Sequence, residues 1–410
     1  MSLLSVDEAR ERILSQFKPV KTETLPLADS SNRVLAQDVR AEYDLPLFDN
    51  SSMDGFALRA SDVTSAGPAS PRSLRVVADI PAGTSPGILL QPGEAARIMT
   101  GAQMPQGADA VIPVEETDFE NRDAGTPAPD NVAVKKAVRV GENVRRRGMD
   151  LQAGRVVLNM GRQLKPQDLG LLAMLGFSSV SVYRKPRIAL LSSGDELIDA
   201  DAPLEPGKIR DSNSYTLAAL VENAGAEAVR LGVAKDNYES VRDLFEKAVY
   251  LRADLILSSA GVSVGAFDYV KVVIEENGKM DFWRVNMRPG KPVAFGEYRG
   301  IPFIGLPGNP VSAYVGFEVF VRPALQKLAG SSSSGRQVVR VRSEEEIESD
   351  GRESYLRAEV QEVDGILTAR LTGHQGSGNL HSLVQANALL IIPAGVKCVP
   401  AGQEVNAWIL

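Results

Sequence analysis

The chain has 410 residues, which is long for one domain and predicts roughly two to four domains. Hydrophobic residues make up 44% and charged residues 24% of the sequence, as in soluble globular proteins, and the net charge of -7 argues against general nucleic-acid binding. The single cysteine, Cys398, excludes an internal disulfide and fits a reducing compartment. The charged N-terminal segment is unlike a signal peptide, and no apolar run is long enough to span a bilayer, so we expect a cytoplasmic protein.

The first part of the chain predicts mostly β structure. Residues 5–17 have the pattern of an amphipathic helix, and residues 24–47 predict short strands with turns. From Asp49 to about Asp150 the sequence is β-rich and punctuated by glycines, with an exposed loop or hairpin tip at 120–131. Residues 164–176 then predict a short helix that is closed by its last residue, a glycine.

From Arg187 onward, predicted strands alternate with predicted helices. Strands are expected at RIALLSSG, AEAVRLGVA and ADLILSSAG, and helices at SNSYTLAALVENAG, YESVRDLFEKAVYL and YVKVVIEEN, the first capped by Asp211 or Ser212. This alternation predicts a doubly wound parallel sheet, in which ligands bind beyond the carboxyl ends of the strands. After Leu328, AGSSSSG predicts a linker, and the short strands that follow predict a small barrel or sandwich.

The stretch GLPGNPVS, residues 305–312, joins a predicted buried strand to a predicted helix. Asn309 suits the N-cap of that helix, and Pro310 suits its first position, where the missing N–H costs nothing. The glycines allow the backbone to approach a ligand closely. A strand, a glycine turn and a helix start together predict a cradle for an anion.

Two other strand ends carry polar side chains. Asp195 and Glu196 could hold a hard cation or polarise water, and an acidic first turn of a helix is an equally good interpretation. In SSAGVSVGAFDY, residues 258–269, the glycines and Ser263 could offer donors to a phosphate, with Asp268 and magnesium bridging to it. The alternative for this stretch is a flexible loop with a capping aspartate.

Basic side chains gather in two places. Arg284, Arg288 and Lys291 precede a predicted strand, and three converging cations suit a multiply charged anion, although a solvated basic edge is the simpler interpretation. In VRRRGMD, residues 144–150, three consecutive arginines cannot all face one way, so a surface patch is the default.

Two further turns contain candidate residues. Asp54, in DNSSMDGFAL, precedes a strand and could act in the α/β cleft only if it came from another lobe or subunit. GHQGSGNLHSL contains both histidines, which do not make a zinc site without further ligands. Gly376 and Ser377 in that stretch could bind an anion, and a hairpin turn is at least as good an interpretation. The residues alone thus predict a multidomain protein whose α/β unit binds a phosphorylated or oxyanion ligand, with magnesium as a candidate ion.

Taken together, these stretches resemble the molybdopterin molybdenumtransferase family, the molybdenum-inserting enzymes of cofactor biosynthesis. The joint match spans most of the chain and is far more specific than any single motif. The matching motifs, in the family's order, are DNSSMDGFA, RIMTGAQMPQGADAVIPVEET, NVRRRGMD, SSGDEL, SSAGVSVGAFDY, RPGKPVAFG, GLPGNPVSA and TGHQGS.

The resemblance implies a multidomain α/β protein in four parts and a homodimer. The active site would lie in a cleft between the α/β domain and the inserted lobe of the partner, which would explain why Asp54 lies so far from Asp268 in sequence. The implied parts are a helical dimer arm (1–44 with 150–178), an inserted β-rich lobe (45–149), a central doubly wound parallel-sheet domain that binds molybdopterin (179–330) and a C-terminal β-barrel (331–410).

The implied reaction takes adenylylated molybdopterin and molybdate as substrates, inserts the metal at the dithiolene sulfurs and releases AMP with the help of Mg²⁺. The implied partners are a second copy of the chain, the molybdopterin adenylyltransferase that makes the preceding intermediate and downstream proteins that handle the cofactor. No nucleic acid and no membrane are expected.

Family analogy also assigns roles to particular residues. Asp54, Glu196 and Asp268 are the expected catalytic carboxylates, and the last two are the expected magnesium ligands. The expected molybdate-binding set is Arg288, Lys291, Ser312, Arg357 and Ser377; the remaining substrate-binding candidates are Thr100, Arg145, Asp150, Ser263, Arg284, Pro307 and Pro310.

The chain departs from the family's pattern at two places. Ala260 stands where the family usually shows a second glycine, and its methyl group narrows the approach of the backbone there. Arg284 and Arg288 stand where many members have lysines, which keeps the charge but changes the geometry.

Three other functions compete with this interpretation. An adenylyltransferase shares the α/β domain but lacks the extra lobes, so the first motif and the C-terminal barrel count against it. A molybdopterin-binding scaffold without insertase activity is disfavoured by intact motifs and by the lack of a long linker or second module. A nucleotide-sugar or pyridine-nucleotide enzyme would need G-x-G-x-x-G after a strand, which is missing.

Overall fold

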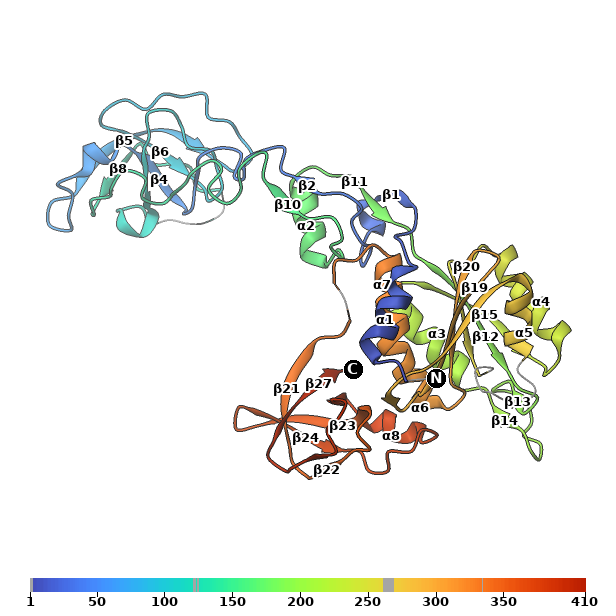
Figure 1. Cartoon of the computed structure of the whole chain (residues 1–410). Helices are drawn as coiled ribbons and strands as arrows, with labels where there is room; N and C mark the ends of the chain where they lie inside the picture. The colour runs from blue at the N-terminus through green and yellow to red at the C-terminus, as the bar shows by residue number, and fades with distance from the viewer. Residues whose placement is uncertain (1–2, 121–122, 124, 261–268, 334) are drawn as a thin grey trace. The chain divides into compact units, whose positions relative to one another are not determined.

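The computed structural model describes residues 3–120, 123, 125–260, 269–333 and 335–410 (Figure 1). Contacts divide the chain into two compact units, one made of Met1–Gln37 with Asn159–Leu410 and the other of Asp38–Leu158. Each unit has a hydrophobic core of its own. None of the helices in the described part is long and apolar enough to cross a membrane.

A six-stranded sheet forms the centre of the larger unit. Its strands lie in the order β15, β12, β16, β20, β19, β17, and the first four are parallel. This confirms the predicted α/β domain, but β19 runs antiparallel to both of its neighbours, β20 and β17. The reason is a two-residue hairpin at Arg299 and Gly300, both with positive φ, which turns β19 directly into β20. The strands span Glu227–Ala234 (β15), Arg187–Ser193 (β12), Leu255–Ser259 (β16), Ile301–Leu306 (β20), Pro292–Tyr298 (β19) and Gly278–Arg284 (β17).

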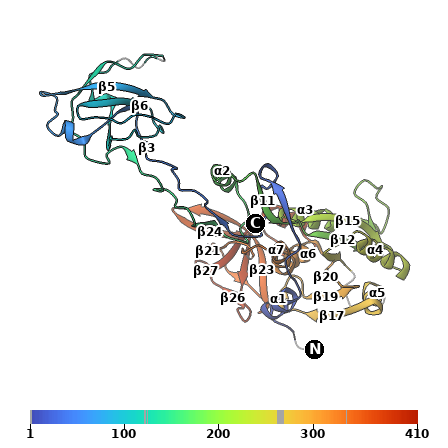
Figure 2. The same ribbon diagram turned by 90° about the horizontal axis from the view of Figure 1, so that it is seen from above.

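Helices cover both faces of this sheet (Figures 1 and 2). Along β12, Ile188 and Leu190 belong to the core on one face, and Ala189 and Leu191 to the core on the other. A strand that is buried on both faces reads as a continuous apolar run, which is why the sequence predicts it. The first face packs against α1 (Val6–Ser15), α3 (Asn213–Asn223), α6 (Pro310–Gly316) and α7 (Arg322–Leu328), and the second against α4 (Tyr238–Tyr250) and α5 (Tyr269–Asn277).

The predicted helix after Asn309 contains a π-helical turn, Phe317–Val321, between α6 and α7. Within this turn the side chain of Glu318 is fully buried and pairs with two arginines, Arg322 at 2.6 Å and Arg336 at 2.7 Å. Arg336 follows the serine-rich linker and also donates to the carbonyl of Ile409. The buried ion cluster therefore anchors the end of the linker to the last helix of the α/β domain.

The C-terminal part is a closed five-stranded barrel, as the short strands predicted. The strands pair in a ring, since β23 bonds both to β24 and to β25. A short strand, β18 (Met287–Arg288), adds to β23 in parallel and so connects the predicted basic turn to the barrel. The elements are β21 (Val338–Ser343), β22 (Ile347–Glu348), β23 (Glu353–Val363), β24 (Ile366–Leu371), α8 (Leu380–Gln385), β25 (Ala388–Ile392), β26 (Cys398–Val399) and β27 (Glu404–Ile409).

Two segments distant in sequence form the remaining part of this unit. β1 (Thr22–Pro26) pairs with β11 (Ser179–Tyr183), and α2 (Pro166–Met174) precedes β11 in the chain. Gly176 has a φ of +83°, a conformation that glycine adopts at no steric cost, and the helix ends just before it as predicted.

The smaller unit is β-rich, as expected. Its main sheet has the strand order β7, β4, β6, β5, β8, with apolar clusters that include Phe56 and Ile98. An added Cβ on Gly55 would lie 2.0 Å from the carbonyl oxygen of Ile112, so this glycine permits the pairing of β4 with β7. The strands are β2 (Val39–Arg40), β3 (Asn50–Ser51), β4 (Gly55–Leu58), β5 (Arg72–Ile80), β6 (Glu94–Ile98), β7 (Ala110–Pro113), β8 (Asn131–Val134), β9 (Val144–Arg145) and β10 (Val156–Leu158).

The buried ion cluster predicts a large effect of one substitution. Glu318→Gln removes the only carboxylate shared by Arg322 and Arg336 among the described residues and leaves two cations facing each other away from water. We expect the free energy of unfolding to fall by about 3–5 kcal/mol. Denaturant titration measures this change.

The matched control is Glu404→Gln, which breaks the solvated pair with Arg340 at 3.4 Å. Its effect should stay below about 1 kcal/mol because both side chains are exposed. Equal stability of the two variants would show that the Glu318 cluster does not anchor the linker.

Candidate active site

A cavity of about 440 Å³ opens at the carboxyl ends of β12, β16 and β20, where the parallel sheet predicts a ligand site. Two predicted site residues, Glu196 and Pro307, lie in its wall. The lining residues are Glu196, Leu197, Ile209, Asn213, Ser259, Ala260, Pro292, Pro307, Gly308 and Asn309.

The loop after β12 places the carboxylates of Asp195 and Glu196 in different surroundings, which the sequence alone does not distinguish. Asp195 is engaged locally, because its carboxylate accepts from the Asp236 N–H at 3.1 Å. Glu196 is exposed at the cavity and has no side-chain partner within the described residues. Gly194 makes room for it, since an added Cβ would lie 2.6 Å from Glu196 Oε2 and φ is +145°. Glu196 is therefore the carboxylate available to a ligand.

The loop after β16 begins with a buried hydroxyl pair, Ser192 Oγ and Ser259 Oγ, 2.9 Å apart. Ala260, which follows, has a φ of +72°, the left-handed conformation that favours glycine. Its N–H donates to the carbonyl of Leu306 at 3.0 Å, so this loop is tied to the end of β20. Ser263 and Asp268, predicted from the same loop, lie outside the described residues.

The predicted anion cradle is present at the start of α6, with one correction. Pro310 is the first helical residue as expected, but the Asn309 side chain does not cap the helix. It donates instead to Ser377 Oγ at 3.0 Å, and the Val311 N–H donates to the carbonyl of Ser377 at 3.0 Å. The cradle and the barrel turn around Ser377 are therefore in direct contact, close to Ser312, which is buried.

Asn213, at the start of α3, is a site residue that sequence reasoning missed. Its side-chain amide donates to the carbonyl of Gly308 at 2.7 Å and so fixes the backbone of the loop before α6. The sequence assigned only a capping role to this region, and Asp211 does accept from the Ser214 N–H at 3.1 Å. No local pattern signals the contact with Gly308, because the two residues are 95 positions apart.

Arg357 is completely buried in β23, where its guanidinium donates four hydrogen bonds to uncharged groups. Three go to the carbonyls of His374, Gln375 and Gly376 and one goes to Ser382 Oγ. Burial, together with the charge of Arg288, lowers the pKa of Arg357 to about 10. Arg357 thus shapes the turn that carries Ser377, and none of its hydrogen-bond partners among the described residues is a carboxylate.

The basic turn lies beside this group. Gly290 has a φ of +100°, and an added Cβ would lie 3.5 Å from the carbonyl oxygen of Ser312, so the turn runs against the start of α6. Arg288 is half-buried, and Asp350 approaches it only to 3.9 Å while binding Arg352 at 2.5 Å. Lys291 is exposed, with no side-chain partner in the described part of the chain.

Arg284 is the least engaged of the three predicted cations. It ends β17 and is exposed, directly across from Pro292, which lines the cavity. Convergence of the three cations on one anion stays a prediction; Arg288 and Lys291 lie in the turn itself.

The other predicted residues belong to the smaller unit. The Asp54 carboxylate accepts from both the N–H and the hydroxyl of Thr100 at 2.7 Å, and these bonds hold the pKa of Asp54 below its ordinary value. Asp54 also lines a cavity of about 350 Å³ with Phe56 and Phe119. The structure thus brings two of the predicted site residues, Asp54 and Thr100, into direct hydrogen-bonded contact.

The three consecutive arginines point to three different carboxylates, as their spacing predicts. Arg145 pairs with Asp150 at 2.5 Å, while Arg146 and Arg147 pair at 2.7 Å each, with Asp49 and Asp44 respectively. All three arginine side chains are largely exposed. The expected pair Arg145 and Asp150 is therefore a solvated ion pair within this unit.

Comparison with known proteins decides the family. Three family models match in order, the MoeA N-terminal region (domain I and II) at residues 4–176, a probable molybdopterin binding domain at 189–327 and the MoeA C-terminal region (domain IV) at 340–410. A molybdopterin molybdenumtransferase of Nostoc sp. is 42% identical over 391 residues, covering 94% of this chain and 88% of the relative. The chain belongs to the molybdopterin molybdenumtransferase family.

Other members of the family extend this similarity to the full length. A relative of the same name from Bacillus subtilis is 35% identical and covers 99% of this chain and 94% of its own length. The crystal structure of a molybdopterin biosynthesis MoeA protein from Pyrococcus horikoshii OT3 is 31% identical, with a TM-score of 0.84 and complete coverage of both chains. The chain is therefore an enzyme of molybdenum cofactor biosynthesis, and all three family models match along it.

The hydrogen bonds of Arg357 predict a structural effect of a conservative change. Arg357→Lys keeps the charge, but a single ammonium cannot reach three carbonyls and a hydroxyl at the same time. We expect the free energy of unfolding to drop by about 1–3 kcal/mol because buried carbonyls lose their donors. Arg342→Lys, at an exposed position of β21 in the same barrel, is the control and should leave stability unchanged. Indistinguishable denaturation midpoints would contradict this role of Arg357.

Proposed function

We propose that this enzyme inserts molybdate into the dithiolene of adenylylated molybdopterin, with Mg²⁺-dependent release of AMP. One observation carries the proposal: the buried Arg357, bonded to uncharged groups, lies behind the turn whose Ser377 contacts the cradle at Asn309. Family membership supports the class of reaction. The geometry supports the choice of a compact, doubly charged oxyanion as one of the two substrates.

The positive charges of Arg288 and Arg357, near the barrel turn that carries Ser377, are poorly neutralised. Arg357 has no hydrogen-bonded carboxylate in the described structure, and Arg288 has only a distant one at 3.9 Å. The effect of Arg288 on the pKa of Arg357 indicates that the two cations repel each other. A dianion bound between Arg288, Lys291 and the hydroxyls of Ser312 and Ser377 would relieve that repulsion. Molybdate is a tetrahedral dianion that suits such converging donors.

The cavity beside this corner is the proposed place of the adenylylated pterin. Glu196 lies in its wall, and Pro307 and Pro310 bound the loop that separates the cavity from the barrel turn. The backbone of the cradle is fixed by Asn213 and by the contact with Ser377. Such rigid loops can hold a phosphate group and an oxyanion at a set distance, which lowers the entropy cost of bringing them together.

The donor set fits a magnesium ion that is bound jointly with substrate. Within the described residues, no group of three or more His, Cys, Asp or Glu side chains could hold a metal. Magnesium commonly uses one or two carboxylates and completes its shell with phosphate oxygens and water. Glu196 is available for this, and Asp268 is the second carboxylate of the proposal. When bound, the ion would neutralise charge on the departing AMP.

We further propose that the chain works as a homodimer in the cytoplasm, with Asp54 acting in the site of the partner subunit. The two hydrogen bonds from Thr100 lower the pKa of the Asp54 carboxyl and fix its direction. Arg145 and Asp150 are assigned to the rim of the same shared cleft. A molybdopterin adenylyltransferase would supply the substrate, and cofactor-handling proteins would receive the product.

The first test combines purified enzyme, adenylylated molybdopterin, magnesium and molybdate, and measures AMP. In this assay Lys291→Ala should raise the molybdate concentration for half-maximal rate by about tenfold, since one charge-assisted contact is lost. Lys247→Ala, which removes the same charge from an exposed position on α4, is the control and should behave as wild type. Unchanged half-saturation in Lys291→Ala would remove the basic turn from the molybdate site, and no AMP from wild type would reject the proposed reaction.

The second test asks whether each site uses residues of both subunits. At a molybdate concentration well below half-saturation, Asp54→Asn and Lys291→Ala chains are each expected to be poorly active as pure dimers. After subunit exchange in equal amounts, half of the dimers would be mixed and each would contain one intact site, so about a quarter of wild-type AMP release should return. Activity that stays at the level of the separate variants would mean that Asp54 and Lys291 serve sites within one chain.

A further inference from the structure

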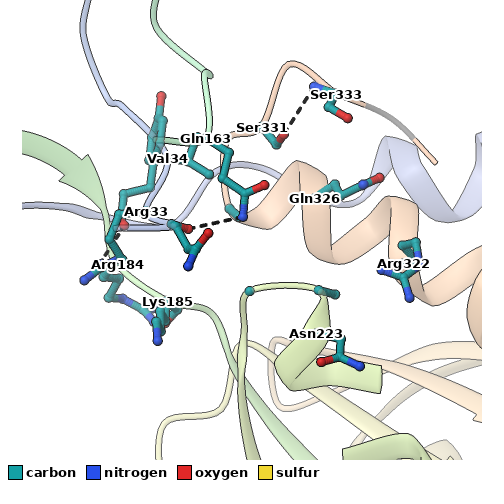
Figure 3. A pocket seen from close by; sticks show the side chains of 15 residues that line it. Arg33, Val34, Gln163, Arg184, Lys185, Asn223, Arg322, Gln326, Ser331 and Ser333 are labelled. Atoms are coloured by element: carbon teal, nitrogen blue, oxygen red, sulfur yellow. Dashed lines mark hydrogen bonds between the residues drawn. The ribbon is translucent and has the colours of Figure 1, made fainter. Parts of the chain in front are cut away.

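We propose that a second cavity, separate from the proposed insertion site, binds a tetrahedral oxyanion dianion of the phosphate class. It has a volume of about 180 Å³ (Figure 3). Its lining residues are Asn32, Arg33, Val34, Gln163, Tyr183, Arg184, Lys185, Asn223, Ala224, Gly225, Arg322, Gln326, Ala329, Ser331 and Ser333, none of which lines the cavity beside Glu196.

Several separate segments of the larger unit build this cavity. The segments around β1 and β11 contribute Arg33, Arg184 and Lys185 on one side. The end of α3 contributes Asn223, and α7 with the serine-rich linker contributes Arg322 and its neighbours on the other side (Figure 3). An occupant would therefore lie between segments that are far apart in the chain.

The charge of the lining is one-sided. Four cationic side chains line the cavity and no carboxylate does. Three of the four cations form ion pairs with carboxylates that do not line the cavity: Arg33 with Glu23, Arg184 with Asp254 at 2.5 Å, and Arg322 with Glu318 at 2.6 Å.

The ion-pair network nevertheless retains an excess of positive charge. Glu318 is shared, because Arg336 binds it as well as Arg322. Five cations, counting Lys185, therefore face three carboxylates, which leaves two positive charges. Arg322 has a side chain that is only 10% exposed, so part of this excess lies where water screens it poorly. A dianion would balance the network.

Two side chains in the wall have donors to spare. The Lys185 ammonium and the Asn223 amide have no hydrogen-bond partner in the described part of the chain. The α3 terminus presents carbonyl groups, which oppose an anion. These are satisfied in part, since the carbonyls of residues 220–222 accept from the N–H groups of residues 224–226. The cationic and amide donors of the cavity wall thus favour an anion more than the carbonyls at the end of α3 oppose it.

The size of the cavity selects the class of ligand. About 180 Å³ accommodates one tetrahedral oxyanion with a few waters and is too small for a nucleotide. Inorganic phosphate and molybdate share the required shape, and phosphate at neutral pH and molybdate both approach the required charge. Binding of either anion would connect the C-terminal end of α3 and the β1 and β11 segments to α7 and to the linker that precedes the barrel.

The test is isothermal titration of the full-length protein with inorganic phosphate and, separately, with molybdate. Lys185→Ala combined with Asn223→Ala removes both spare donors without touching the buried ion pairs. We expect this double variant to lose affinity for the anion by at least about tenfold. Lys247→Ala, with the same loss of one positive charge, should bind as wild type. Both anions are titrated in a Lys291→Ala background, with and without the double substitution, because this background weakens the proposed insertion site about tenfold and leaves the second cavity intact.

Thermal unfolding without anion serves as the folding control, and the double variant should match wild type within about 1 °C because both positions are at the surface or at a helix end. A crystal soaked in molybdate should show the anion between Lys185 and Asn223. Saturable binding that the double variant abolishes supports the proposal, with the preferred anion decided by the two titrations. Wild-type affinity in the double variant, or no saturable binding of either anion to the wild type, overturns it.

Discussion

The contact between the barrel turn and the start of α6 is the interaction on which the candidate active site depends. Asn309 and Ser377 meet there, and Arg357 holds the turn by donating to three of its carbonyls. Because these donors are spent on the backbone, the charge of Arg357 is fixed in place without being neutralised. A buried cation of this kind is costly unless a ligand completes its surroundings. An anion bound at the proposed site would offset that cost.

Local sequence patterns predicted the layers well because each depends on near neighbours. The apolar run of β12 is continuous since both of its faces are buried, and the serine-rich linker marks the true start of the barrel. The direction of β19 was not predicted, because its middle residues are buried on both faces and read as a continuous apolar run, as in a parallel strand. Arg299 and Gly300 decide it, and their two-residue turn was the available signal.

Side-chain partners across long sequence separations were beyond such patterns. Asn309 sits at the N-cap position, as its residue type predicts, yet its side chain bonds to Ser377, 68 residues away. Asn213 reaches Gly308 in the same manner. Residue type states what a side chain can donate, whereas tertiary packing selects the acceptor. The sequence can therefore indicate which residue types are candidates for the site, whereas the contacts that orient them appear only in the structure.

One continuous helical segment connects the two proposed anion sites. α6 begins at the cradle, and α7, after the π-helical turn, lines the second cavity with Arg322. A π-turn inserts one extra residue into the helix and often marks a functional position. Here it points Glu318 into the core, where two arginines satisfy it and one of them ends the linker to the barrel. An anion that balances Arg322 would strengthen the attachment of the linker, and the barrel in turn presents Ser377 to the cradle. The two proposed sites thus share one helical segment of the α/β domain.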